Sequence, residues 1–210
     1  MTMPNKLDHK KALILVDIQN DFCHGGALAV PDADEVVDVA NRLAYQFIGS
    51  GDIVVATRDL HPPDHGSFAS QAKVEVGTIG ELGGITQVFW PDHCVLGSKG
   101  ADFHPGLQLD LIDRVFAKGQ DKHIDSYSGF FDNDHKTSTG LYDFLVEKNV
   151  SAVTIVGLAT DYCVAATARD AIALGFDTTV VAEGCRAVDL AAGDGERALE
   201  DLRQIGVTII

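Results

Sequence analysis

Short apolar runs alternate with helical patterns along this chain, and this alternation limits the possible folds most strongly. Helical spacing of apolar residues occurs at 34–48, 140–148, 162–174 and 194–205. The apolar runs are ALILVDI at 12–18, IVVAT at 53–57, AVTIVG at 152–157 and TTVVAE at 178–183, with weaker runs at 114–119 and 207–210. Continuous apolar runs are typical of strands buried on both faces. We predict an α/β fold with a doubly wound, mostly parallel sheet of about six strands and helices on both faces.

The length of 210 residues predicts a single domain over 1–210. One connection, at about 58–110, is much longer than the others, is rich in Gly, Pro and His, and has little periodicity. Connections of this length in compact domains are usually functional. The phosphate-binding motifs GxGxxG and GxxxxGK[ST] do not occur after the first predicted strand, so a nucleotide site lacks support.

Charge and composition exclude several classes of partner. The net charge is −15, whereas nucleic-acid and anionic membrane surfaces are bound by clustered Lys and Arg. Residues 1–10 are polar, without an apolar signal segment, and no run approaches the roughly 20 apolar residues of a membrane span. We expect a cytoplasmic protein that binds a small molecule, with no nucleic acid and no membrane partner. Its oligomeric state, monomer or homo-oligomer, stays open.

Reactive side chains follow four of the predicted strands. Asp17 ends the first run, Asp59 follows the second, Lys118 ends the run at 114–119 and Cys163 follows the run at 152–157. Ligands of open α/β sheets bind beyond the carboxyl ends of the strands. We therefore expect these four side chains to converge on one site.

Cys163 is the strongest candidate for a nucleophile among four widely spaced cysteines, which form no CxxC pair. Asp161 is placed to cap the following helix, which would put Cys163 in the first helical turn. Free N–H groups and the helix dipole there favour a thiolate and can bind an oxyanion. A buried cysteine is more often a core residue, and we interpret Cys23, Cys94 and Cys185 in that way.

Histidines in the long connection indicate a metal site. DLH at 59–61 and WPDHC at 90–94 supply one carboxylate and two imidazoles, a donor set that suits zinc, iron or manganese. A polar turn is the alternative interpretation of DLH. His65 is an optional fourth ligand, and the remaining histidines are expected in turns or on the surface.

The chain resembles the nicotinamidases, a group of isochorismatase-like cysteine hydrolases, over nearly its whole length. The blocks that carry the resemblance occur together and in order: LVDIQNDFCHGGALAV, VVATRDLHPPDHGSF, WPDHCVLGSKGADFHPGL, FAKG, SYSGFFD and GLATDYCV. WPDHC together with DLH distinguishes nicotinamidases from members without a metal. The middle residue of DLH, Leu60, departs from the aromatic residue frequent in the family, which affects only local packing.

The resemblance implies a role for each matching residue. Cys163 is expected to be the nucleophile, Asp17 the general base and acid, and Lys118 the cationic third member. Asp59, His61 and His93 are expected to bind the metal. The residues expected around the substrate are Phe22, Trp90, Ala159 and Tyr162. The resemblance further implies a cis Leu158–Ala159 peptide and an oxyanion hole formed by the amides of Ala159 and Cys163.

The expected reaction is hydrolysis of nicotinamide to nicotinate and ammonia through a cysteine thioester, with a divalent metal, zinc before iron or manganese, docking the pyridine nitrogen. Pyrazinamide is an expected second substrate. Three alternatives stay open at this point. They are an amidohydrolase of the same superfamily acting on a carbamoyl or ureido substrate, a metal-hydroxide mechanism, and a non-catalytic α/β module that binds a metal or nucleotide.

Overall fold

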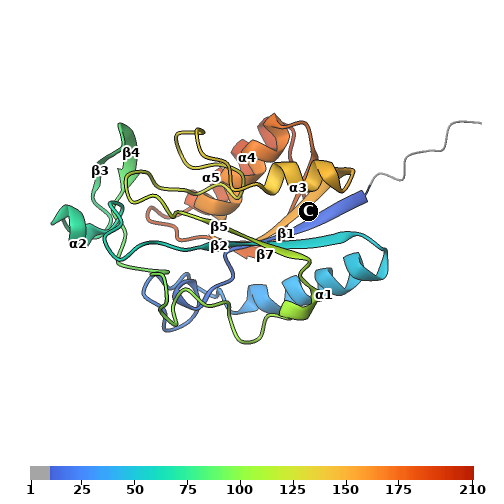
Figure 1. Cartoon of the computed structure of the whole chain (residues 1–210), viewed down its shortest axis with the longest axis horizontal. Helices are drawn as coiled ribbons and strands as arrows, with labels where there is room; N and C mark the ends of the chain where they lie inside the picture. Colours follow the sequence, from blue (N-terminus) through green and yellow to red (C-terminus); the bar gives the residue numbers. More distant parts are fainter. Residues whose placement is uncertain (1–9) are drawn as a thin grey trace, which may run out of the picture.

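A computed structural model describes residues 10–210 and has a central parallel sheet between two layers of helices (Figure 1). The sheet has six strands in the order β5-β2-β1-β6-β7-β8, and each neighbouring pair is parallel. The strands are β1 Lys10–Val16, β2 Ile53–Asp59, β5 Arg114–Lys118, β6 Val150–Leu158, β7 Asp177–Arg186 and β8 Thr208–Ile209. The predicted fold class and number of strands are confirmed. The prediction about a signal segment at 1–10 falls almost entirely outside the described residues.

Helix α1 covers one face of the sheet, and α3, α4 and α5 cover the other (Figure 1). Their bounds are α1 Glu35–Gly49, α3 Leu141–Glu147, α4 Ala165–Ala173 and α5 Asp194–Gln204. Strand β1 contributes apolar side chains to the cores on both faces of the sheet. Leu13 and Leu15 are buried on the α1 side, while Ile14 and Val16 are buried on the opposite side. Alternate side chains of a strand point to opposite faces, so an unbroken apolar run supplies two cores.

The chain reverses its direction of progress across the sheet between β1 and β6. From β1 the strands proceed to β2 and β5 on one side, and from β6 to β7 and β8 on the other. The carboxyl ends of strands at such a reversal form the usual ligand crevice of an open α/β sheet. Gly157 lets β6 approach β1 closely there, because its φ is +132° and a Cβ atom would meet the backbone of Val16.

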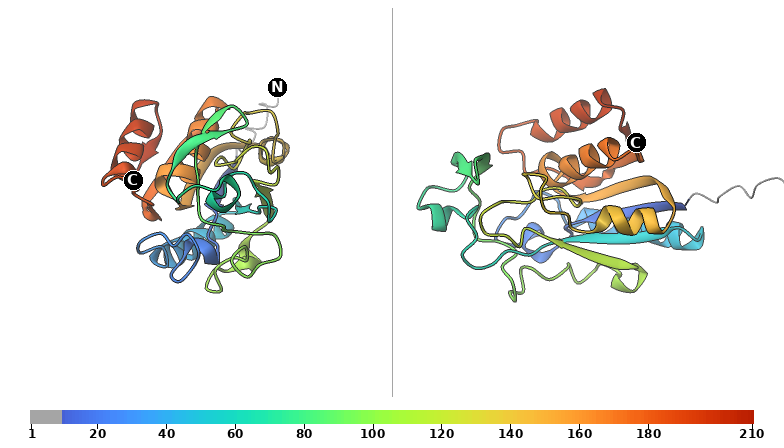
Figure 2. Two further views of the ribbon diagram at one scale, coloured as in Figure 1. Left: turned by 90° about the vertical axis from the view of Figure 1, so that its left-hand side faces the viewer. Right: turned by 45° about the horizontal axis from the view of Figure 1, so that its top comes forward.

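The long connection at 58–110 contains structure that the sequence pattern did not predict. It holds the short helix α2 Ala69–Ala72 and an antiparallel hairpin of β3 Ile79–Leu82 and β4 Ile85–Val88. The right-hand view in Figure 2 places this excursion outside the central sheet, beyond the carboxyl ends of its strands. The excursion therefore reaches over the end of the sheet where the site was expected.

The prediction that Asp161 caps the helix after β6 is wrong. A turn of π-helix, Thr160–Val164, comes first, α4 begins at Ala165, and neither start has a side-chain cap. The carboxylate of Asp161 instead accepts the backbone N–H groups of Val188 and Asp189, at 3.0 and 2.9 Å. Asp161 thus fixes the loop after β7 to the turn that carries Cys163.

Candidate active site

Lys118 lies at the centre of the group of side chains predicted from the strand ends. Its Nζ lies 3.0 Å from Asp17 Oδ2 and 3.5 Å from Cys163 Sγ, and it donates to Asp59 Oδ1 at 3.0 Å. A fourth contact, to the carbonyl oxygen of Ser126 at 2.8 Å, anchors it. Burial opposes the charge of Lys118, but the carboxylates of Asp17 and Asp59 outweigh it and raise the pKa of the ammonium well above its usual range. The predicted convergence on one site is therefore present.

Asp17 is held immediately beyond β1 in an unusual backbone conformation. Its φ is +49°, and its side chain is fully buried. The hydroxyl of Thr57, on β2, donates to Asp17 Oδ1 at 2.7 Å, and the Asp17 N–H donates back to the Thr57 oxygen at 3.2 Å. Burial raises the pKa of the Asp17 carboxyl, and the charge of Lys118 opposes this effect. A buried carboxyl with a raised pKa can exchange protons nearer to neutral pH than an exposed one.

Cys163 lies in the π-helical turn, with 6% of its surface exposed. Burial raises the pKa of its thiol well above the usual value; Lys118 opposes this, while the carboxylates of Asp17 and Asp59 add to it. The thiol is therefore the resting form, and ionisation requires a neighbouring base. The peptide between Leu158 and Ala159, at the start of this turn, is cis, as the resemblance implied.

Asp59, His61 and His93 form a second group, which we call the ligand group. Asp59 Oδ2 lies 3.2 Å from His61 Nε2 and 3.6 Å from His93 Nε2. All three side chains are buried, and their donor atoms lie within 4.8 Å of one another. Burial alone would raise the pKa of Asp59, but the charge that His61 carries when it is protonated and the charge of Lys118 outweigh it and hold the pKa well below the usual range.

The tautomers of the two imidazoles fit a metal ion. His61 Nδ1 lies 2.8 Å from the carbonyl oxygen of Gly119, and His93 Nδ1 lies 2.8 Å from that of Pro91. A carbonyl oxygen only accepts, so each Nδ1 carries a proton and each Nε2 has a free lone pair when the ring is neutral. His61 Nε2 is buried without a hydrogen-bond partner. Two lone pairs facing a carboxylate oxygen are the donor set that a divalent ion requires.

His65 is near the ligand group but has the opposite tautomer. The backbone N–H of Ser67 donates to His65 Nδ1 at 3.2 Å, and the Ser67 hydroxyl lies 2.7 Å from the same nitrogen. A backbone N–H can only donate, so Nδ1 carries the lone pair and Nε2 carries the proton in the neutral ring. The available lone pair of His65 therefore faces Ser67 and not the ligand group.

An aromatic cavity joins the two groups. Its lining includes Cys163 from one group, Asp59 and His93 from the other, and Ala159 between them. The remaining lining residues are Phe22, Leu28, Trp90, Asp125, Tyr127, Tyr162 and Val188. All the predicted substrate-contacting residues thus line one cavity.

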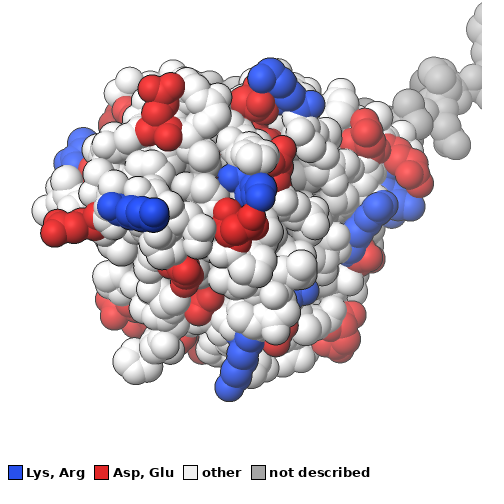
Figure 3. All heavy atoms as spheres, turned by 60° about the vertical axis from the view of Figure 1, so that its left-hand side comes forward, with Lys and Arg blue, Asp and Glu red and all other residues white. Residues whose placement is uncertain are grey.

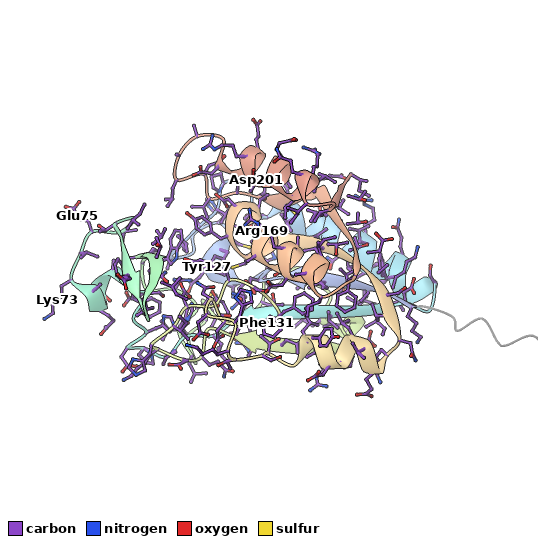
Figure 4. The ribbon with its side chains drawn as sticks, turned by 90° about the horizontal axis from the view of Figure 1, so that it is seen from above. Lys73, Glu75, Tyr127, Phe131, Arg169 and Asp201 are labelled. Carbon is purple, nitrogen blue, oxygen red and sulfur yellow. The ribbon has the colours of Figure 1, made fainter. Side chains whose placement is uncertain are left out.

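Tyr127 fixes the aromatic wall and was not predicted from the sequence. The Trp90 ring nitrogen donates to its hydroxyl at 3.2 Å, and the Tyr162 ring meets both Trp90 and Tyr127 edge to face. Figure 4 shows Tyr127 between the excursion, marked by Lys73 and Glu75, and the helices that carry Arg169 and Asp201. Tyr127 lies in the SYSGFFD block, but nothing in the spacing of that block indicated a role for this residue.

Charged side chains of both signs are spread over the surface of the described residues (Figure 3). On the face shown in Figure 3, the described Lys and Arg side chains are scattered and separated by neutral and acidic residues. None of the helices within residues 10–210 has both the length and the apolar character required to cross a membrane.

The comparisons with known proteins agree with this arrangement. Residues 11–210 match the isochorismatase domain. The chain is 49% identical to the nicotinamidase of Escherichia coli over 199 residues, covering 95% of this chain and 93% of that protein. A nicotinamidase and pyrazinamidase structure from Acinetobacter baumannii aligns with a TM-score of 0.91 and 43% identity, covering 98% of this chain and 97% of that one. The pyrazinamidase of Pyrococcus horikoshii in complex with zinc aligns with a TM-score of 0.79 and 35% identity, covering 96% and 98%. With this sequence match and this arrangement of side chains, the chain belongs to the isochorismatase family.

Proposed function

We propose that the protein is a nicotinamidase, which hydrolyses the carboxamide of nicotinamide to nicotinate and ammonia through a thioester on Cys163. The observation that carries the proposal is the position of Lys118, whose Nζ contacts Asp17, Cys163 and Asp59 at once. Lys118 thereby connects the base Asp17 with Cys163 and Asp59, and the latter two line the aromatic cavity together with His93. The similarity to nicotinamidases over almost the full chain supports the same substrate.

Asp59, His61 and His93 would hold one divalent ion, which would supply a Lewis-acidic docking point for the pyridine nitrogen. Zinc is our first assignment, because the donor set suits it and a related pyrazinamidase is known in complex with zinc. Iron and manganese suit the same donors. Phe22 and Trp90 would enclose the ring, with Tyr162 packed against Trp90.

In the first half of the reaction, Asp17 takes the proton of the Cys163 thiol. The sulfur attacks the carboxamide carbon, and the amides of Ala159 and Cys163 stabilise the oxyanion. Each donor lowers the barrier by about 3–4 kcal/mol. Asp17 then gives its proton to the departing nitrogen, the C–N bond breaks, and ammonia leaves a thioester. Lys118 keeps its charge throughout and balances whichever neighbour is ionised.

In the second half, Asp17 accepts a proton from water as that water attacks the thioester carbonyl carbon. The C–S bond breaks, nicotinate is released, and the proton returns to the Cys163 sulfur. The same carboxyl therefore serves as base and acid in turn, a cycle that its burial and raised pKa favour.

The same arrangement supports two wider proposals. Pyrazinamide keeps the ring nitrogen and the carboxamide in the same relation, so we expect it to be a substrate. The site also takes residues from 17 to 163, and we infer that the chain works as one domain whose long connection supplies the metal ligands.

The decisive experiment is direct measurement of nicotinate and ammonia formed from nicotinamide by the purified protein, before and after chelation and after readdition of zinc. We expect turnover that is lost with the chelator and restored by zinc. A panel with carbamoyl and ureido compounds separates the superfamily alternative. If one of those compounds releases ammonia faster than nicotinamide does, that compound would be assigned as the substrate in place of nicotinamide.

A further inference from the structure

Asp125 is a buried acid in the cavity that the mechanism above does not use. It lies on the connection between β5 and α3 and is 3% exposed. It lines the same cavity as Cys163 and His93. Its carboxylate also lies within 4.8 Å of nitrogen atoms of His61 and His65. Asp125 is therefore an additional acid on the metal side of the substrate cavity.

The hydrogen bonds of Asp125 fit an ionised carboxylate. The Ser126 N–H donates to Oδ1 at 2.8 Å, and the Gln87 side-chain amide donates to Oδ2 at 2.7 Å. Both partners are N–H donors, which satisfy a carboxylate without requiring a proton on it. Gln87 belongs to β4 and is itself 2% exposed, so the excursion holds this charge in place from outside the central sheet.

Asp125 is placed beside the ligand group and is not a member of it. Asp59 Oδ2 approaches both Nε2 atoms of the ligand group, at 3.2 and 3.6 Å. Within residues 10–210, Asp125 makes no carboxylate–imidazole contact of that kind, and both of its oxygens already accept an N–H. His65, whose Nε2 carries the proton in its neutral tautomer, belongs to the same cluster as Asp125.

The charges around the cavity balance only when Asp125 is counted. Asp59 and Asp125 line the cavity, and Lys118, which pairs with Asp17, contacts both Asp59 and Cys163 of the lining. When ionised, the three carboxylates match the combined charge of the Lys118 ammonium and, when it is bound, a divalent ion. A neutral ring nitrogen adds a ligand to such a site without adding charge. A carboxylate, which is a good ligand for divalent ions, would bring a further negative charge against Asp125 in a poorly solvated space.

We propose that Asp125, held by Gln87 and Ser126, is a specificity-determining residue that makes the cavity favour neutral nitrogen heteroaromatic amides over aromatic carboxylates. The inference rests on the proposed function, because it takes the ring nitrogen to dock on the ligand group. It implies that the charge of Asp125 weakens binding of the carboxylate product and of any aromatic acid that approaches the ion.

The test measures binding to zinc-loaded protein by calorimetry, in a Cys163→Ala background that prevents turnover. Benzoate is the probe for a carboxylate without a ring nitrogen, and nicotinamide is the neutral comparison. Asp125→Asn should bind benzoate at least about tenfold more tightly, because removing one unit charge about 12 Å away at an effective dielectric constant near 20 already gives that factor and a closer carboxylate gives more. Nicotinamide affinity should change by less than about threefold, since its ring carries no charge. Asp110→Asn, which makes the same charge change in the exposed turn Leu109–Leu111, should leave both affinities unchanged.

Unchanged benzoate affinity in Asp125→Asn would overturn the proposal. Loss of bound zinc in that variant would also overturn it, because Asp125 would then be a direct ligand. If melting shows that the asparagine variant is unfolded, Asp125→Ser removes the same charge with a smaller side chain and gives the same readout. Failure of the Cys163→Ala parent to bind nicotinamide would refute the proposed function, while the benzoate comparison would still report on Asp125.

Discussion

The two halves of the site are held in place by different parts of the fold. In the strand-end group of Asp17, Lys118 and Cys163, the first two stand where β1 and β5 finish and Cys163 lies in the turn that follows β6, so the order of the parallel strands brings the three together. The imidazoles of the ligand group are oriented by carbonyl oxygens of loops, those of Gly119 and Pro91. The position of the nucleophilic half therefore depends mainly on the sheet, whereas the orientation of the two imidazoles in the metal half depends on irregular backbone. Changes to the two halves should therefore have separable consequences.

The largest expected effect belongs to the strand-end group. Cys163→Ala removes the atom that forms the thioester, so turnover of nicotinamide should fall by about 10⁴-fold or more. Bound zinc should be unchanged, because the sulfur is not part of the ligand group. Single-turnover assays and elemental analysis of the same preparation measure both quantities. Near-normal ammonia release from this variant would instead favour a metal-hydroxide mechanism.

The ligand group should show the reverse pattern. His61→Ala and His93→Ala should weaken zinc binding by at least about a hundredfold and lower turnover through poor positioning of the ring. The Cys163 thiol should still react with iodoacetamide. Zinc retained after gel filtration, measured by elemental analysis, is the readout.

His65→Ala is the matched control for the ligand group. It removes an imidazole from the same loop whose free lone pair faces Ser67, so zinc should be retained. If His65→Ala loses as much zinc as His61→Ala does, His65 is a ligand and its imidazole ring flips when the ion binds.

Lys118 contacts both halves, and its replacement should perturb both to an intermediate degree. Lys118→Met leaves Asp17 and Asp59 buried without their cation, which typically costs about 3–5 kcal/mol of stability. It also removes the charge that lowers the pKa of the Cys163 thiol, so the rise of alkylation rate with pH should move to higher pH. Thermal melting and iodoacetamide labelling against pH measure the two effects.

The control for this replacement is Lys122→Met, which removes an exposed lysine that pairs with Asp64 on the surface. The melting temperature of this variant should stay close to that of the unmodified protein, as is usual when an exposed ion pair is removed. An alkylation profile in Lys118→Met that matches the unmodified protein would remove Lys118 from its assigned role.

The same contrast explains what could be predicted from the sequence. Unbroken apolar runs identified the strands, and a parallel sheet places their carboxyl ends together, so the convergence of Asp17, Lys118 and Cys163 followed from periodicity. Cys163 as a nucleophile and the imidazoles of DLH and WPDHC as metal donors were candidates from the residues alone, and the resemblance assigned the remaining roles. No spacing rule states which loop imidazole turns its Nε2 toward Asp59.

The features that were missed depend on contacts between distant segments. The hairpin strands β3 and β4 have four residues each, and Gln87 is the one buried residue in them, which leaves little apolar periodic signal. Asp161 is a residue type that often caps helices, but its carboxylate accepts N–H groups of the loop after β7 instead. The pairing of Gln87 with Asp125 spans 38 residues between two loop-rich segments, and neither residue type indicates the other.

The smallest expected effect concerns Thr57, whose hydroxyl bonds Asp17 Oδ1 across adjacent strands. This hydrogen bond stabilises the ionised carboxylate and lowers the pKa of Asp17, against the effect of burial. Thr57→Val keeps the shape of the side chain but removes the hydroxyl, so the pKa of Asp17 should rise further. A base with a higher pKa is protonated over more of the acidic range. The acidic limb of kcat/KM for nicotinamide should therefore move to higher pH. Thr178→Val is the matched control, because Thr178 is also buried in a strand but bonds the carbonyl oxygen of Phe176.

A lower plateau with an unmoved acidic limb in Thr57→Val would mean that the titrating base is not Asp17. The proton-transfer step would then have to be reassigned, although the sheet would still place that carboxyl beside Lys118.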